Sequence, residues 1–432
     1  MIGGLVPAPV RMSAPVPPPP PSPTAASATA WRVATFLALA SAINYADRAA
    51  MSAVLPAVRS DLGLSDVSLG LLGSVFLWCY ALGSPVAGAI ADRWPRRRII
   101  VGSLIAWSVV TAVTGAARGY HDLLALRVAL GLAECLFLPA AIALIADWHA
   151  AGTRARAMSF ISIGVNGGMI LGGSFAGYMA QHHGWRSGFW VLGLTGLALA
   201  LLAKPMLPPA PAAAPADAPR KASFVEALRY LVRVPSYFVL VAESMLSGLG
   251  NWIFLAWLPL YFKDTYDMTL AGAGFAGTFM LQVSVVLGVI AGSWISDRLS
   301  ARAPERRMLL YAVFYFAAAP FLLFFLGQPA FPVVAAAISA YAFFRGVGQA
   351  NDNATQCEIV PARYRSTGVG IMNTISTAAG GCGVLIVGYL KRELGLGAIF
   401  ASVSGIFVLA GLVLLTGYLR FIRDDIRRAQ AG

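Results

Sequence analysis

Apolar runs recur along almost the whole chain, and they constrain its fold more than any other feature of the sequence. Each holds roughly twenty residues, enough for an α-helix to cross the ~30 Å hydrocarbon core of a bilayer. The runs lack the alternation of barrel strands, and backbone groups in lipid must bond within the chain, so helices are expected. With 58% hydrophobic and 12% charged residues, the 432-residue chain is too apolar for a soluble globule. We predict an all-α membrane protein with twelve transmembrane helices, at residues 33–57, 67–91, 99–117, 122–146, 157–181, 186–203, 236–262, 270–295, 308–327, 330–351, 366–390 and 395–419.

The formal net charge of +13 raises the question whether the chain binds nucleic acid. If both tails and the even-numbered loops lie on one side, that side holds 23 of the 32 Lys and Arg residues and the other side holds six. The remaining three, Arg48, Arg127 and Arg345, lie within spans. The positive-inside rule then places both termini in the cytoplasm. We expect a multi-pass protein of the plasma membrane, the inner membrane in a bacterium, whose partner is the lipid bilayer and not nucleic acid.

The cysteine and histidine patterns argue against a metal site, a cofactor site and an enzyme. The cysteines have no CxxC spacing and imply neither a disulfide framework nor metal ligation; they are Cys79, Cys135, Cys357 and Cys382. The histidines lie in loops or at span ends, so a buried Ser-His dyad and an HExxH zinc motif are excluded; they are His121, His149, His182 and His183. We predict a protein without catalytic residues, metal or cofactor.

A linker and a repeat indicate two halves of six spans each. Spans six and seven are separated by a Pro/Ala-rich stretch and a basic segment at residues 204–234. Asp92-Arg93 follows span two, and Asp297-Arg298 follows span eight, 205 residues later. Such repeats are typical of transporters that hold their substrate between two halves near the bilayer midplane. The predicted order is a disordered Pro/Ala-rich cytoplasmic tail (1–30), an N-terminal six-helix bundle (31–203), the cytoplasmic linker, a pseudo-symmetric C-terminal six-helix bundle (235–419) and a basic cytoplasmic tail (420–432).

Asp47 and Arg48 lie in the middle of the first span, where contact with lipid is costly. A charged side chain at the centre of a membrane helix costs on the order of 2.5–3.5 kcal/mol, so both residues must face protein or a water-filled cavity. Asn44, Asp47 and Arg48 are three and four residues apart and therefore share one face of the helix, with Tyr45 to one side.

The fourth span repeats this feature with Arg127 and Glu134, seven residues apart and two turns along nearly one helix face. Burial favours the neutral form of a carboxyl group, whereas a nearby guanidinium favours its charged form. Under these opposed influences a carboxyl group can take up a proton when the cation moves or binds another anion. This is the chemistry of proton-coupled anion transport. The alternative is that both pairs are fixed ion pairs that hold helices together, although apolar packing would serve as well.

Other polar residues within the spans allow two interpretations. Arg345 in span ten, Asp352 directly after that span and Glu243 in span seven either reach the cavity or are solvated near the cytoplasm, and the sequence does not decide between these. Asn166 in span five and Asn373 in span eleven are predicted to line the cavity. Close helix packing is predicted at the glycines spaced by four residues in span five, which are Gly164, Gly168 and Gly172.

Five motifs in the first half resemble those of a known family. They are N-Y-x-D-R (44–48), G-x-x-x-S-x-F-x-W-x-Y (70–80), G-x-x-x-D-R-x-x-R-R (88–97), R-x-x-x-G-x-x-E (127–134) and G-W-R (184–186). The third is specific to the major facilitator superfamily, and the first and fourth are similar to those of its anion:cation symporter family. The resemblance covers nearly the whole chain after the tail.

The resemblance implies alternating-access import of small organic anions, such as sugar acids and carboxylates, together with protons. It implies that Asp47 and Glu134 are the protonation sites. It implies a substrate-binding group formed by Tyr45, Arg48 and Arg127, to which Asn44, Asn166 and Asn373 are added from their positions in the spans. It also implies a cytoplasmic latch that changes contacts as the halves rock, formed by Gly88, Asp92, Arg93 and Arg97 and, by the repeat, Asp297 and Arg298. The alternative for the latch is a basic anchor at the membrane surface.

Ser84-Pro85 departs from that family, because many of its members carry Gln near the end of span two. This dipeptide, with the first and fourth motifs, also resembles the Spinster branch, whose members move lipids or lysolipids. The leading hypothesis is a proton:organic-anion symporter, a monomer with a small anionic solute and protons as partners and the proton as coupling ion. One alternative is a Spinster-like or drug-type exporter of lipophilic compounds; if the compound is cationic, the two arginines argue against it. Another alternative is a transporter-like sensor without flux.

Overall fold

The computed structural model describes residues 23–149, 151–208, 224–301, 303–327 and 329–431. These residues are almost entirely helical and contain no strand. The first half comprises α1 (Pro23–Leu62), α2 (Asp66–Arg93), α3 (Arg96–Thr114), α4 (Tyr120–Glu134), α5 (Phe137–Trp148), α6 (Ala151–His182) and α7 (Trp185–Leu201). Two short helices follow, α8 (Ala203–Met206) and α9 (Phe224–Leu231). The second half comprises α10 (Pro235–Tyr266), α11 (Leu270–Ser300), α12 (Arg306–Ala318), the 3-10 helix η1 (Ala319–Phe325), α13 (Phe331–Gln349), α14 (Asp352–Ile359), η2 (Ala362–Tyr364), α15 (Arg365–Arg420) and α16 (Ile422–Ala431).

These helices account for the twelve predicted spans. Nine segments of the described chain are long and apolar enough to cross a membrane. One of them, α15, crosses twice, because Gly395 adopts φ 74° and turns the chain back on itself, a conformation that favours glycine. The 17-residue apolar helix α7 and the first helix, which contains Asp47 and Arg48, complete the set. The prediction of an all-α membrane fold with twelve helices is confirmed.

Three predicted spans are interrupted rather than continuous. Span four breaks at Cys135 and Leu136, directly after Glu134, and span ten breaks at Ala350 and Asn351. Span nine tightens into the 3-10 helix η1, where a proline supplies no backbone N–H for a regular helix. In span four the interruption places Glu134 at a helix end.

The N-terminal boundary was wrong by several residues. We assigned residues 1–30 to a disordered tail, but α1 already begins at Pro23. Proline is favoured at the first helical position, and four of the next seven residues are alanine, the strongest helix former. Residues 1–22 of the predicted tail and 209–223 of the predicted linker lie outside the described residues. The remaining domain boundaries stay predictions.

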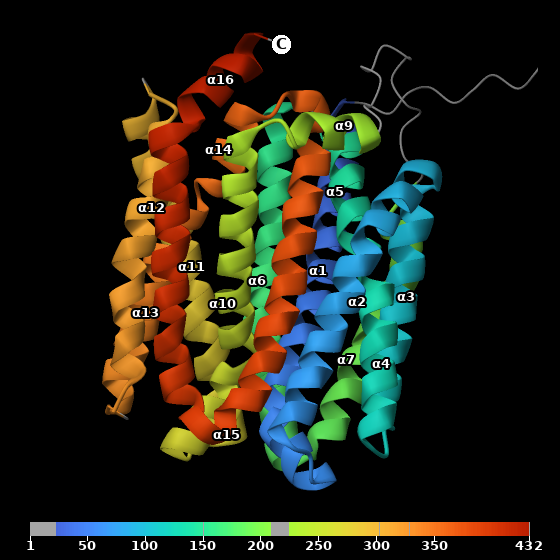
Figure 1. The fold of residues 1–432 in the computed structure, drawn as a ribbon. Coiled ribbons are helices and arrows are strands. Elements are labelled where there is room, and N and C mark those ends of the chain that lie inside the picture. Colours follow the sequence, from blue (N-terminus) through green and yellow to red (C-terminus); the bar gives the residue numbers. More distant parts are fainter. Residues whose placement is uncertain (1–22, 150, 209–223, 302, 328, 432) are drawn as a thin grey trace, which may run out of the picture.

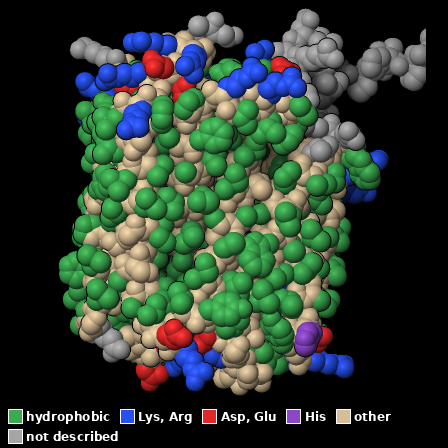
Figure 2. Space-filling view, viewed as in Figure 1, with side chains coloured by type: hydrophobic (Ala, Val, Ile, Leu, Met, Phe, Trp, Pro, Cys, Tyr) green, Lys and Arg blue, Asp and Glu red, His purple; other side chains and the backbone are tan. Residues whose placement is uncertain are grey.

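The spans run alongside one another from end to end of the molecule (Figure 1). We call the end that holds α9, α14 and α16 the terminal end, and the end that holds the α1–α2 connection and the turn at Gly395 the far end. Figure 2 shows apolar side chains covering the middle of this face, whereas Lys and Arg gather at the terminal end. The apolar band matches a surface in contact with lipid tails, and the basic rim matches the side that positive residues favour.

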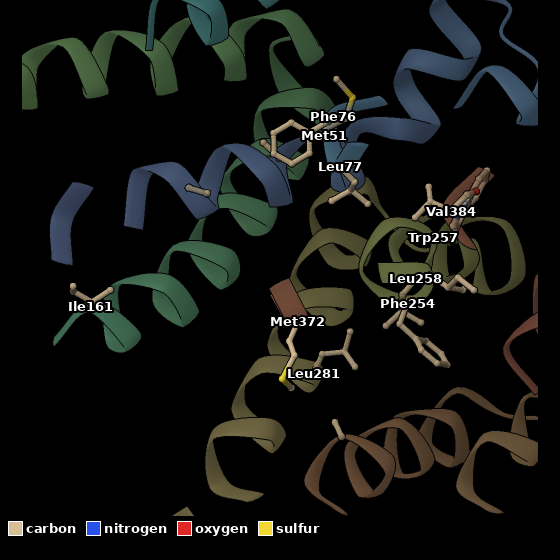
Figure 3. Close-up of a cluster of buried hydrophobic side chains, with 14 of the residues drawn as sticks. Met51, Phe76, Leu77, Ile161, Phe254, Trp257, Leu258, Leu281, Met372 and Val384 are labelled. Carbon is tan, nitrogen blue, oxygen red and sulfur yellow. Dashed lines mark hydrogen bonds between the residues drawn. The ribbon is translucent and has the colours of Figure 1, made fainter. Parts of the chain in front are cut away.

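The two halves pack against each other through α1 with α10 and α11, α2 with α15, and α6 with α11. Ser74 Oγ of α2 donates to the Gly381 carbonyl of α15 at 2.7 Å. Trp78 Nε1 donates to the Ala378 carbonyl at 3.2 Å. Buried apolar side chains from both halves, among them Met51, Phe76, Leu77, Trp257 and Val384, form part of one continuous core (Figure 3).

Four charged residues join the halves at the far end, and we call them the far-end ion cluster. Arg59 lies 3.1 Å from Asp264 and 3.6 Å from Asp66. Lys391 Nζ lies 2.8 Å from Asp66 and 3.3 Å from Asp264. Arg59 and Asp66 belong to the first half, and Asp264 and Lys391 to the second. Each cation therefore contacts one acid of each half, so the cluster links the halves where they meet.

Helix α6 packs against α1 along the predicted glycine stripe. A Cβ atom at Gly164, Gly168 or Gly172 would overlap the backbone of Ala38, Ala42 or Ala46, respectively. Both stripes repeat every four residues, so the two backbones approach over two turns without intervening side chains. The stretch of α1 that holds Asn44, Asp47 and Arg48 is thus held directly against α6, as the packing interpretation predicts.

Gly168→Ala is expected to lower the thermal unfolding temperature, because the added methyl group meets the Ala42 carbonyl and forces the helices apart. Overpacking of this kind costs about 1–3 kcal/mol. Gly167→Ala is the matched control, since a Cβ there meets nothing within 4 Å and alanine favours the helix. Scanning fluorimetry of both variants in one detergent checks the difference. Equal melting temperatures would contradict the close approach.

Candidate functional site

The charged residues of spans one and four meet inside the first half. Arg48 Nε of α1 donates to Glu134 Oε2 at the end of α4, at a distance of 2.7 Å. The Arg48 side chain is 5% exposed and the Glu134 side chain 0%. The sequence expectation that these charges face protein is confirmed, and the ion pair ties the middle of α1 to the interruption in span four.

Aromatic rings enclose the Arg48 guanidinium. Its carbon lies 4.6 Å from the ring centre of Tyr45, 4.4 Å from that of Tyr80 and 5.2 Å from that of Phe76. The negative faces of such rings attract a cation, and the attraction grows when water is excluded. Tyr45 was predicted as a site residue. Phe76 and Tyr80 were quoted in the span-two motif but given no role, and their spacing of four residues on one face was the signal that could have found them.

Asp47 and Arg127 lie beside this pair. Asp47 is 1% exposed and accepts a hydrogen bond from the Thr111 hydroxyl of α3 through Oδ2. Arg127 is 4% exposed, and the charges that act on it are those of Asp47 and Glu134. No ion pair within 4.0 Å of Arg127 is found among the residues that the structure describes. Thr111 was missed, because a single threonine in an apolar span has no sequence signal.

Three polar atoms of the site are buried without a hydrogen-bond partner in the described structure. They are Asn44 Nδ2, Asp47 Oδ1 and Glu134 Oε1. Buried polar atoms are normally hydrogen-bonded, so unpaired ones at one place mark a site that binds something further. The first is a donor, and each carboxyl oxygen can accept a hydrogen bond or take a proton. Within the described structure, the site therefore has one unused donor and two unused acceptors.

The charges do not pair as in the alternative interpretation. That interpretation took Asp47–Arg48 and Arg127–Glu134 as two fixed ion pairs. Instead, Arg48 pairs with Glu134 across two helices, and Asp47 bonds a hydroxyl group. The helix interruption after Glu134 presents that carboxylate to α1, and residues adjacent in sequence, such as Asp47 and Arg48, point in different directions on a helix.

The two asparagines predicted to line the cavity are not part of this contact group. Asn166 is partly buried, and its Nδ2 donates to the Ser162 carbonyl of its own helix at 2.8 Å. Asn373 is exposed on α15. Within the described residues, neither forms a hydrogen bond with Asp47, Arg48 or Glu134. Their substrate-binding roles stay predictions.

No cofactor or metal group stands out beside the charges. The four cysteines are free thiols, and no three His, Cys, Asp or Glu side chains in the described ranges gather as metal ligands would. The site thus consists of two carboxyl groups, two guanidinium groups and the hydroxyl, amide and aromatic side chains around them.

The predicted latch is placed only in part. The side chains of Asp92 and Arg93 lie outside the described residues. A Cβ at Gly88 would meet nothing within 4 Å. Arg97 is half-buried, whereas its neighbour Arg96, to which we gave no role, forms an ion pair with Asp147. Arg96 also donates to the Ala143 carbonyl at 3.3 Å, and so joins α3 to α5.

The second half contains the matching contact. Asp297 accepts a hydrogen bond from Arg307 at 3.0 Å, and Arg298 stacks 3.7 Å from the centre of the Trp294 ring. Arg307 Nε also lies 2.8 Å from Glu358. Arg307 and Glu358 follow Arg96 and Asp147 by 211 residues each, and they join the corresponding spans. The same arginine–acid contact therefore recurs in both halves, close to the positions that the repeat predicts.

The G-W-R motif anchors the far end of the first half. Gly184 adopts φ 79°, which turns the chain into α7. Arg186 Nη1 lies 2.6 Å from Asp61 Oδ2, and Trp185 Nε1 donates to the same oxygen at 3.0 Å. Arg186 also donates to the Ala117 carbonyl at 3.2 Å from two nitrogens. One arginine thus links the ends of α1 and α3 to the start of α7.

Asp61→Asn is expected to lower thermal stability at neutral pH and to have no effect in acid. The hydrogen bonds from Arg186 and Trp185 hold the pKa of Asp61 below its ordinary value. A carboxyl group with a depressed pKa in the folded state stabilises the fold above its unfolded pKa, and this is lost as the pH falls through the folded value. The side chain is 43% exposed, so the effect is on the order of 0.5 kcal/mol. Melting curves of wild type and variant at pH 7 and in strong acid test this, and a constant gap would contradict it.

Comparison with known proteins shows that this chain is similar to transporters. The chain is 26% identical over 427 residues to the probable galactarate/D-glucarate transporter GudP of Bacillus subtilis, covering 90% of this chain and 92% of that protein. It is 29% identical over 294 residues to an MFS-type efflux pump of Mycolicibacterium smegmatis, covering 66% of each chain.

The fold also matches a solved structure. A bacterial homolog of the human lysosomal transporter Spinster, in an inward-facing and unoccupied conformation, superposes with a TM-score of 0.73 and 21% identity, covering 92% of this chain and 97% of that one. The sequence model of the Major Facilitator Superfamily matches residues 37–384. This agrees with the resemblance drawn from the motifs, and the chain belongs to the Major Facilitator Superfamily.

Proposed function

We propose that the protein is a proton-coupled symporter that takes up a small organic anion, a sugar acid or another carboxylate, by alternating access. The observation that supports this most is the buried Arg48–Glu134 ion pair, with Asp47 and Arg127 beside it. Protons, the anionic solute and the bilayer are the partners in this proposal, and one chain suffices for it.

Proton uptake at Glu134 frees Arg48 for the substrate. While Glu134 is ionised, it accepts from Arg48 Nε at 2.7 Å and competes with any other anion for this cation. A protonated Glu134 no longer neutralises the guanidinium. Arg48 can then bind a substrate carboxylate through its planar fork of N–H donors, a geometry that lysine lacks. Tyr45 and Tyr80 hold the guanidinium plane in place through the exchange.

Charge balance links the number of protons to the charge of the substrate. Two arginines and two carboxylates sum to zero in the empty site. Because uncompensated charge in a membrane interior is costly, the occupied site must also stay close to neutral. A monoanion then requires one proton. A dicarboxylate requires two, and Asp47 and Glu134 supply two positions for them.

We further propose that the terminal end faces the cytoplasm and the far end faces outwards. The excess of Lys and Arg at the terminal end supports this orientation. The far-end ion cluster then closes the outer side. In a bacterium, the membrane would be the inner one.

The likeness to a probable galactarate/D-glucarate transporter supports the choice of substrate class. Purified protein in vesicles tests the proposal with labelled glucarate, galactarate and a hexuronate. An inward proton gradient is expected to drive accumulation, and a protonophore to abolish it. Asp47→Asn is expected to remove accumulation, with the exposed Asp424→Asn as control. Uptake that ignores the proton gradient and is unchanged in Asp47→Asn would overturn the proposal.

The alternative function is export of lipophilic compounds. Two observations favour it. The chain is similar to an efflux pump, and it has the Ser84-Pro85 dipeptide that resembles the Spinster branch, in which the Ser84 hydroxyl donates to the Tyr80 carbonyl at 2.7 Å. Binding of lysolipids or drugs without binding of sugar acids would support this second candidate. The two buried arginines favour an anion.

A further inference from the structure

A second group of buried acids lies in the second half of the molecule. Glu243 of α10 is 0% exposed. Its Oε1 accepts a hydrogen bond from the Tyr315 hydroxyl of α12 at 2.7 Å, and the Tyr315 and Tyr311 hydroxyls lie 3.2 Å apart. Asp352, the first residue of α14, interacts electrostatically with Glu243. The function proposed above uses none of these residues.

Several polar atoms of this group have no hydrogen-bond partner in the described structure. Glu243 Oε2 and Asp352 Oδ1 are buried and unpaired, as are the Tyr341 hydroxyl and Gln356 Nε2. No cation lies within 4.0 Å of either carboxyl group among the described residues. Aromatic rings surround the group, with Phe407 5.2 Å from both Tyr315 and Tyr341. The two carboxyl groups are therefore buried among aromatic side chains and have no paired counter-charge in the described structure.

Moving an isolated carboxylate from water into such surroundings costs free energy that no cation compensates, so the neutral acid is favoured. A neutral Glu243 can accept the hydrogen bond from the Tyr315 hydroxyl at Oε1 and carry its proton on the unpaired Oε2. The titratable groups that act on it are Tyr311 and Tyr315 from α12, Arg345 from α13 and Asp352 from α14. Arg345 is half-buried and forms no ion pair within the described residues, so its charge acts only at longer range. Among the other neighbours of α10, α16 supplies Asp425, which accepts from the Ser236 N–H nearer the terminal end.

The positions of the acids follow the internal repeat. Asp47 and Glu134 lie on the first and fourth spans of the first half. Glu243 and Asp352 lie on the first span of the second half and at the end of its fourth. The depth differs, because Glu243 is the ninth residue of α10 from the terminal end, whereas Asp47 lies near the middle of α1. The second group is therefore closer to the terminal end.

We propose that Glu243 is a further proton-binding site, separate from Asp47 and Glu134, and that Asp352 is the acid that links it to the terminal end. A proton from water converts the Glu243 carboxylate to the carboxylic acid and is returned to water on release. The coupling role of this site rests on the function proposed above, whereas its protonation does not.

Infrared spectroscopy of the protein in lipid nanodiscs tests the protonation directly. Wild type at neutral pH is expected to show a protonated-carboxyl C=O band that Glu243→Gln lacks. Glu226→Gln is the matched control, because Glu226 also accepts a hydrogen bond from a tyrosine hydroxyl, that of Tyr364 at 2.7 Å, but is exposed and lies outside the spans. Tyr315→Phe keeps the acid and is expected to shift the band, so the test stands even if Glu243→Gln fails to fold. Identical spectra of wild type and the Glu243→Gln or Tyr315→Phe variant would overturn the proposal.

Vesicle transport tests the coupling role. If Glu243 takes part in coupling, wild type moves one proton more per anion than the charge balance of Asp47, Glu134 and the two arginines requires. Glu243→Gln is expected to remove that additional proton, in proportion to the single titrating group removed, while anion exchange persists. An unchanged ratio alongside the lost infrared band would overturn the coupling role and leave a static neutral acid. If wild type moves no protons with any anion, the proposed function fails, and the infrared result still decides whether Glu243 binds a proton.

Discussion

Arg48→Ala is expected to reduce anion uptake by about 30-fold or more, since truncating one partner of a buried charge pair costs about 2–5 kcal/mol. Arg48 contacts Glu134 at 2.7 Å and lies between the rings of Tyr45 and Tyr80. In the proposed mechanism the substrate carboxylate takes the place of Glu134 beside Arg48, so no other group of the site can replace Arg48. Initial uptake rates in vesicles at matched protein density give the measurement.

A structural role for Arg48 must be separated from substrate binding. Alanine alone leaves Glu134 buried without its counter-ion, which costs about 3–5 kcal/mol of stability. The double variant Arg48→Ala/Glu134→Gln removes that orphaned charge and is expected to recover the melting temperature but not transport. Arg48→Lys keeps the charge without the planar fork, and partial activity is expected. Recovery of uptake in the double variant would show that Arg48 only holds the fold.

Glu134→Gln is expected to bind the anion independently of pH and to lose accumulation. The amide imitates the protonated acid permanently, so Arg48 stays available to the substrate at every pH. Wild type is expected to bind more weakly as the pH rises, because Glu134 then competes for Arg48. Binding followed by intrinsic tryptophan fluorescence from pH 5 to 8, together with counterflow and accumulation assays, checks both statements.

The exposed Glu393→Gln is the control for Glu134→Gln, and its binding should follow wild type at each pH. If the affinity of Glu134→Gln for the anion still falls as the pH rises, another group is the one that titrates, and Asp47 is the next candidate. Retained accumulation in that variant would contradict a coupling role for Glu134.

Sequence patterns predicted the spans and the burial of Asp47, Arg48, Arg127 and Glu134, because both follow from the cost of polar groups in lipid. They did not predict which charges pair. Pairing between α1 and α4 depends on how the helices pack and on the interruption after Glu134, and an apolar run shows neither. The same limit applies to Thr111, which reaches Asp47 only through the packing of α3.

The sequence located the internal repeat more accurately than the side-chain contacts that the repeated segments form. The acid–arginine dipeptides marked equivalent loops, but Arg96 and Arg307, not Arg97 and Arg298, form the ion pairs with Asp147 and Glu358. Adjacent arginines look alike in a sequence, and the direction of each side chain on its helix decides which one reaches the acid. For Glu243 the sequence predicted the span, but only the tertiary structure shows that the side chain is buried and not solvated by cytoplasmic water.

Because of the far-end ion cluster, the two ends of the protein respond differently to ionic strength. Its side chains are 11–35% exposed, so dissolved ions reach them. Interactions between exposed charges weaken as the Debye length shortens from about 10 Å at 0.1 M to about 3 Å at 1 M salt. Raising the ionic strength on the far side alone therefore favours separation of the halves there, whereas the buried Arg48–Glu134 pair is shielded from it. Under the alternating-access mechanism proposed above, the balance between the two orientations is then expected to depend on the salinity of one compartment.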